Sequence, residues 1–146
     1  MGLIFLLINC FMVNAQIVSK VQDIDFGKFI IYGQGGTLSV SPNGIYNFSG
    51  NIIQKSIPTP ASFDLYIAAG KKVQMTYNKN VILNGPNGGK ITFELTDSSP
   101  TGDGVFFTGT SPTRLSLGGT LTIGSPLVTP VGLYSGFVQV SIMVNN

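Results

Sequence analysis

The stretch that decides the fold of this chain is Tyr134-Ser-Gly-Phe-Val-Gln-Val-Ser-Ile-Met-Val144. Its apolar residues alternate with a period of two, which is the spacing of side chains on one face of a β-strand. One face would hold Tyr134, Val138, Val140, Ile142 and Val144. Phe137 and Met143 would lie on the opposite face, beside Gln139 and Ser141. The pattern predicts a strand that packs one face on a hydrophobic core.

Shorter runs of the same kind precede this strand and are separated by turn residues. The alternating runs are Gly36–Ser41, Ile45–Phe48, Ala61–Ile67, Lys72–Tyr77, Lys90–Leu95, Arg114–Leu117 and Gly119–Ile123. Turn chemistry lies between them, as in Pro42-Asn43-Gly44 and in Asn84–Gly89. No window shows a sustained helical period with capping residues, so no long helix is expected. Strands of this length and spacing indicate an all-β sandwich or barrel.

One segment of the chain has an internal echo. Gly35-Gly-Thr-Leu-Ser-Val-Ser-Pro42 recurs as Gly118-Gly-Thr-Leu-Thr-Ile-Gly-Ser-Pro126. A single echo is not a repeat array, which needs several copies at a short fixed period. We interpret it as two strands with similar entry turns.

The composition excludes several classes of protein. Charged residues make up 10% of the chain, against about 25% in typical globular proteins, and the formal net charge is +2. No dense stripe of Lys and Arg is present to neutralise phosphates, so nucleic-acid binding is not expected. Apolar residues make up 43%, which is too many for a disordered chain of small net charge.

The N-terminal segment has the pattern of a secretory signal. An apolar run from Leu3 to Val13 precedes Ala15, a small residue that signal peptidase accepts at its cleavage site. The run is too short to span a bilayer. We therefore expect residues 1–15 to be a signal peptide and residues 16–146 a single β-sandwich domain. The alternative is lipidation of Cys10. No Lys or Arg occurs before Lys20, so we expect either a start codon upstream of Met1 or a signal with a weak positive end.

The sequence contains few of the residue types that catalyse reactions in enzymes. The chain has no His, and its one Cys lies in the predicted leader, which removes catalytic triads, Cys-His dyads and imidazole zinc sites. Asp23 and Asp25 would face the same way on an extended chain, but such a pair more often solubilises a sheet edge than catalyses hydrolysis. We expect no catalytic activity and no cofactor.

The best candidate metal site is the segment from Asp97 to Gly104. Alternating oxygen donors of the kind that Ca²⁺ prefers stand at Asp97, Ser99, Thr101 and Asp103. The terminal bidentate Glu of a calcium loop is missing, because Thr108 stands at its position. A solvated turn is the favoured interpretation, with weak Ca²⁺ binding as the alternative.

Aromatic residues raise the question of a sugar platform. The candidates are Tyr32, Tyr46, Tyr66, Phe106 and Phe107. Neighbours on a strand face opposite ways, so one residue of the Phe106-Phe107 pair should be core and the other exposed. Core or edge packing is the favoured role of these aromatic residues, because a half-buried sheet needs large apolar side chains on one face.

Four segments in order carry a resemblance to a known family. They are Asp25-Phe26-Gly27, Gly35–Gly44, Gly118–Ile123 and Gly132–Asn145. Together they resemble the exported bacterial family called domain of unknown function 4402. The last segment is also similar to the closing strand of spore-coat-U-like and fimbrial subunits, although Gly136 stands where those often have an acidic residue. The resemblance implies an immunoglobulin-like or pilin-like β-sandwich of about seven to nine strands, located at or beyond the bacterial envelope, with no catalytic residues.

These observations lead to a functional expectation. We expect a non-enzymatic exported protein of the periplasm, cell surface or extracellular space, structural or adhesive, and a subunit of a surface assembly. Its partners would be itself or other envelope proteins, through strand-edge pairing, with the segment Gln16–Ile24 as the exposed edge or pairing arm. No nucleic acid and no transmembrane segment of the mature chain are expected. The alternative is a soluble extracellular binding module for glycan or Ca²⁺.

Overall fold

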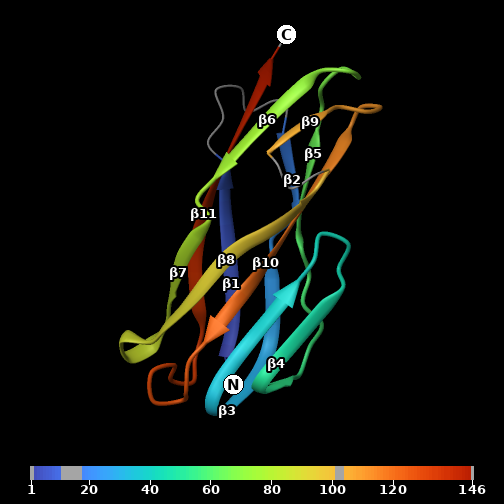
Figure 1. The fold of residues 1–146 in the computed structure, drawn as a ribbon. Helices are drawn as coiled ribbons and strands as arrows, with labels where there is room; N and C mark the ends of the chain where they lie inside the picture. Colours follow the sequence, from blue (N-terminus) through green and yellow to red (C-terminus); the bar gives the residue numbers. More distant parts are fainter. Residues whose placement is uncertain (1, 11–17, 101–103, 146) are drawn as a thin grey trace.

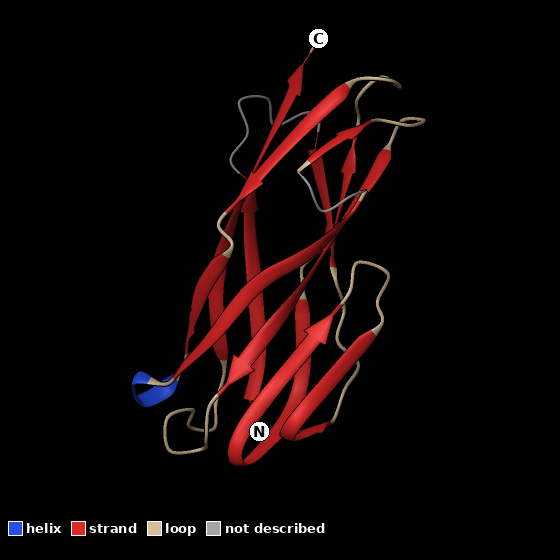
Figure 2. Ribbon diagram, viewed as in Figure 1, coloured by secondary structure: helices blue, strands red, loops and turns tan. Residues whose placement is uncertain are grey.

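The computed structural model describes residues 2–10, 18–100 and 104–145, which form an elongated all-β structure (Figure 1). Strands make up nearly all of its regular structure, and the described residues contain one 3₁₀ turn, Pro86–Gly88, and no α-helix (Figure 2). The strands are β1 Gly2–Cys10, β2 Val18–Gln22, β3 Asp25–Val40, β4 Tyr46–Gln54, β5 Ala61–Leu65, β6 Lys72–Tyr77, β7 Asn80–Asn84, β8 Lys90–Ser99, β9 Val105–Phe107, β10 Thr113–Ile123 and β11 Tyr134–Asn145. The predicted all-β sandwich is confirmed.

The described residues form eleven strands, more than the seven to nine expected. One addition is β1, which lies within the predicted leader. Another arises because the run of residues along one side of β11 is interrupted at Asn78 and Lys79, which divides it into β6 and β7. At this break the Asn78 N–H still donates to the Gln139 carbonyl of β11, at 3.3 Å.

Six strands pair in a closed ring, in the order β3, β1, β11, β7, β8, β10 and back to β3. The dark-blue β1 lies between β11 and β3, parallel to the first and antiparallel to the second (Figure 1). Residues 119–122 of β10 pair with β8 on one side and with β3 on the other. The ring of these six strands therefore has no open edge.

The strand β3 pairs with both β1 and β10 because it bends in its middle (Figure 1). Its first part, Asp25–Phe29, pairs with β1, and its last part, Gly36–Val40, pairs with β10. Gly35 lies at the bend with φ +80°, and a Cβ atom there would lie 2.2 Å from the Ile123 carbonyl oxygen. Only glycine combines this backbone conformation with so close an approach.

The predicted faces of the strands are confirmed. On β11, Val138 and Val140 are at most 1% exposed, whereas Phe137 is 58% exposed. Of the adjacent pair on β9, Phe106 is buried and Phe107 is exposed, as the alternation requires. Within the core the fully buried rings of Phe26 and Phe93 meet edge to face, with centroids 5.8 Å apart.

The two echoing segments turn out to be neighbours. Residues 36–40 of β3 pair antiparallel with residues 119–123 of β10, and Leu38 is the register partner of Leu121. Both leucines are fully buried. The predicted entry turns are wrong, because Gly35-Gly36 and Gly118-Gly119 lie within the continuous strands β3 and β10. The two echoing segments are instead the parts of these strands that pair with each other.

Among the described residues, no helix is long and apolar enough to cross a membrane.

Candidate functional site

The predicted calcium ligands are only partly described. Asp97 and Ser99 lie at the end of β8, and both are exposed, whereas Thr101 and Asp103 lie outside the described residues. One carboxylate oxygen of Asp97 accepts a hydrogen bond from the Ser98 N–H at 2.8 Å. The described residues contain no group of three or more His, Cys, Asp or Glu side chains placed to hold a metal ion.

Asp97 and Ser99 do lie together on a polar cleft of about 270 Å³. The cleft is lined by Ser41, Pro42, Asn43, Asp97, Ser98, Ser99 and Ser116, which come from the turn after β3 and from β8 and β10. The hydroxyl of Ser41 contacts the Asn43 side chain, so the turn presents a fixed pair of polar groups. Hydroxyl, amide and carboxylate groups in this arrangement are suited to a polyol or a hydrated cation. Sequence reasoning missed Ser41 and Asn43, because no local pattern links residues 41–43 to residues 97–99.

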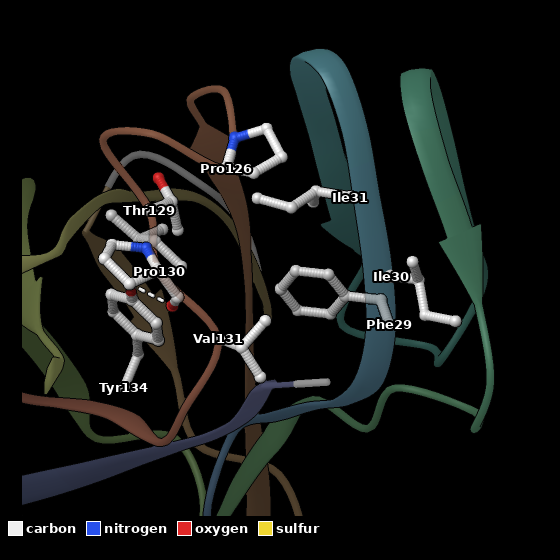
Figure 3. Close-up of a pocket in the computed structure, with 9 residues that line it drawn as sticks. Phe29, Ile30, Ile31, Pro126, Thr129, Pro130, Val131 and Tyr134 are labelled. Atoms are coloured by element: carbon white, nitrogen blue, oxygen red, sulfur yellow. Dashed lines mark hydrogen bonds between the residues drawn. The ribbon is translucent and has the colours of Figure 1, made fainter.

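A second cleft is apolar and holds about 60 Å³ (Figure 3). Phe29 and Ile31 point from β3 toward the loop before β11, whereas Ile30 points away (Figure 3). The loop contributes Pro126, Thr129, Pro130 and Val131, and Ile91 and Tyr134 complete the lining. At this size the cleft fits a single side chain and not a whole small-molecule ligand, which needs several hundred Å³.

Tyr134 anchors the floor of the apolar cleft. Its ring is 2% exposed, and its hydroxyl donates to the Pro130 carbonyl oxygen at 2.7 Å (Figure 3). Burial raises the pKa of the Tyr134 phenol above its ordinary value. A Cβ atom on Gly85 would lie 2.4 Å from the ring, so that turn is shaped around the tyrosine. The phenol is therefore neutral at neutral pH and already hydrogen-bonded, which suits a structural role.

The apolar cleft lies where β1 begins. Gly2 is the register partner of Phe29 on β3, and Ile4 is the partner of Tyr134 on β11. Phe29 and Tyr134 both line the cleft. The cleft therefore continues the seam in which β1 lies.

The order of hydrogen-bonded neighbours among the described strands runs from β2 at one end to β4 at the other. Among the described strands β2 pairs only with β5, and β4 pairs only with β3. On β2, Val18 is half-buried and the other four residues are exposed. On β4, Phe48 is 50% exposed although its register partner Leu38 is fully buried. The predicted edge at residues 16–24 thus contains an edge strand, while residues 16 and 17 lie outside the described residues.

The other sequence candidates do not converge on one site. Asp23 forms an ion pair with Lys20 at 2.9 Å, and Asp25 accepts a hydrogen bond from the Gly27 N–H at 2.7 Å. Tyr46 pairs with Val40, whereas Tyr32 lies in the register gap between Ile31 and Gly36. The exposed Tyr66 follows β5. None of these candidate residues lines either of the two clefts described above.

Comparison with known proteins supports one of the two resemblances described above. No curated protein and no solved structure matches the chain. The chain belongs to the family described as Domain of unknown function (DUF4402), whose family model matches residues 17–143.

Proposed function

We propose that the protein is a non-enzymatic, exported subunit of a surface assembly, structural or adhesive, that associates through strand edges. The observation that supports this proposal is the pair of end strands. β2 and β4 each have one strand neighbour among the described residues, and apolar side chains of Phe48, Ile53 and Val21 are about half exposed there. Exposed strand edges with apolar side chains are templates for pairing with another chain.

Export is the first part of the proposal. The apolar run of residues 3–13, followed by Ala15, is the pattern that directs secretion and cleavage. The test is to express the full chain in a bacterial host, fractionate the cells and measure the mass of the recovered protein. We expect it outside the cytoplasm with Gln16 as its first residue. A mass that begins at Met1, or a lipid on Cys10, would contradict this part.

Assembly is the second part, and solution size tests it. We expect the exported protein to form oligomers that grow with concentration in light scattering. Deleting Gln16–Gln22 should reduce this association and leave a folded sandwich, because the residues of β2 after Val18 are exposed. A strict monomer at every concentration, with or without this segment, would refute the assembly.

The polar cleft favours a second candidate, a binding module for glycan or Ca²⁺. Asp97, Ser99 and Asn43 present carboxylate, hydroxyl and amide groups to one cleft. Calorimetric titration with CaCl₂ and with a panel of oligosaccharides tests this role. Binding that saturates, and that Asp97→Asn abolishes while Asp64→Asn does not, would establish the module in place of the assembly.

A further inference from the structure

The strand β1 closes the ring of strands. Residues 4–10 pair with residues 134–140 of β11, and residues 2–5 pair with β3 between Asp25 and Phe29. No other described strand joins β3 to β11. Without β1, the ring would be open along this seam, here called the β3–β11 slot.

The strand that closes the ring lies outside the domain that the family shares. The family match begins at residue 17, and β1 ends at Cys10. Removal of the leader after Ala15, as proposed above, would take β1 away with it. The exported domain would then contain every strand of the ring except the one that closes it.

An open slot would be costly. It would leave seven consecutive residues of β11 without their pairing partner on that side. Two of these residues, Val138 and Val140, are at most 1% exposed in the closed ring, as is Phe26 on β3. Unpaired backbone groups next to newly exposed apolar side chains favour the addition of a strand.

We propose that, in the assembly, the slot of one exported copy is filled by the N-terminal arm of a second copy, Gln16–Gln22. This inference rests on the proposed function, because it requires leader removal and self-association. The arm directly follows the proposed cut, so it would end in a free terminus. In the structure its described part, β2, is held by four register pairs with β5, interrupted by a register shift.

The sequence of the arm fits the slot. Beside the slot, β11 has a buried face with Val138 and Val140 and an exposed face with Phe137. A strand seated there needs one core-compatible face and one that tolerates water. If the arm is seated as an extended strand, its sequence would put Ile17, Ser19 and Val21 on one face and Val18, Lys20 and Gln22 on the other.

The arm of the same copy is unsuited to its own slot. Ile24, which follows the arm, is 1% exposed. The next residue, Asp25, exchanges two backbone hydrogen bonds with Thr59, at 3.0 and 2.7 Å. To turn back along β3, the arm would have to pull Ile24 out of the core and break this bridge. A second copy supplies the strand without that cost.

Disulfide trapping tests the proposal. All variants carry Cys10→Ser, so the introduced cysteine is the only one. Lys20→Cys on the arm and Phe137→Cys on β11 are exported and purified separately, then mixed under mild oxidation. The matched control replaces Phe137→Cys with Phe107→Cys, because Phe107 is similarly exposed, at 67%, on a strand that pairs only with β6 in the described part of the chain.

We expect the Lys20→Cys and Phe137→Cys proteins to form a mixed disulfide dimer several-fold more abundant than the dimer with Phe107→Cys. Equal yields with both partners, or no dimer with Phe137→Cys, would overturn the inference. Gln22→Cys is tested in parallel, because a shift of the arm by two residues would place position 22, instead of position 20, beside position 137.

A peptide distinguishes this inference from the proposed function. The peptide has the sequence of residues 2–10 with Cys10→Ser and added lysines, and it should compete with the arm and reduce cross-linking, whereas a scrambled peptide should not. If light scattering finds oligomers but neither cross-linking nor the peptide involves the slot, the slot inference fails and the assembly stands. A strict monomer refutes the assembly itself.

Discussion

Replacing Tyr134 with phenylalanine tests how the closing strand is anchored. The change removes only the hydroxyl, which donates to the Pro130 carbonyl oxygen at 2.7 Å, from a side chain that is 2% exposed. A hydrogen bond of this kind contributes about 0.5–1.5 kcal/mol to the free energy of unfolding. With a typical urea m-value, the midpoint of unfolding of the full chain should fall by roughly 0.3–1 M at pH 7.

The same variant should change the pH dependence of stability. Burial raises the pKa of Tyr134 in the folded protein above its ordinary value, which in the unfolded chain is about 10. The stabilising contribution is therefore complete below pH 10 and is lost as pH rises from 10 through the folded-state pKa. The stability gap between the natural protein and Tyr134→Phe should narrow over that window.

Urea unfolding at pH 7 and at several values above pH 10 measures both effects. Tyr66→Phe is the matched control, since Tyr66 is 50% exposed, and it should change stability by less than about 0.5 kcal/mol. If Tyr134→Phe unfolds at the same urea concentration as the natural protein at pH 7, the buried hydrogen bond does not anchor β11. A gap that widens above pH 10 would contradict the raised pKa.

Three further changes probe the packing of the core. Deleting Tyr134–Asn146 should abolish cooperative thermal unfolding, because it removes three almost fully buried side chains. Their burial contributes about 1.5–3 kcal/mol each, which together is comparable to a total stability of roughly 5–15 kcal/mol. A cooperative melt near the natural temperature would refute this. Gly85→Ala places a Cβ atom 2.4 Å from the tyrosine ring and should destabilise by about 1–3 kcal/mol, whereas Gly109→Ala, with no atom within 4 Å of the new Cβ, should be nearly neutral in urea unfolding. A double-mutant cycle that changes Phe26 and Phe93 to leucine should give a coupling of about 0.5–1.5 kcal/mol for their edge-to-face contact; additive effects would show that the rings only fill space.

The candidate sites show the limit of local patterns. Asp97 and Ser99 are recognisable as a group in the sequence because they are alternating oxygen donors of one short polar segment. The cleft they share with Ser41 and Asn43 depends on the turn after β3 lying beside β8 and β10. The apolar cleft likewise combines β3 with the loop before β11. In both clefts the lining residues come from segments far apart in the sequence, and no sequence motif links them.

The sequence by itself determined the class of the fold, the inward and outward faces of its strands, and the family. The class and the faces follow from alternation with a period of two, which is a property of neighbouring residues and survives any choice of strand partner. The family follows from four segments that occur in a fixed order. Only the tertiary structure decided which strands pair: that Leu38 meets Leu121, that β3 bends to pair with both β1 and β10, and that residues 2–10 close the ring between β3 and β11. Such pairings join residues far apart along the chain, and they depend on which backbone edges and apolar faces remain open once the other strands have packed.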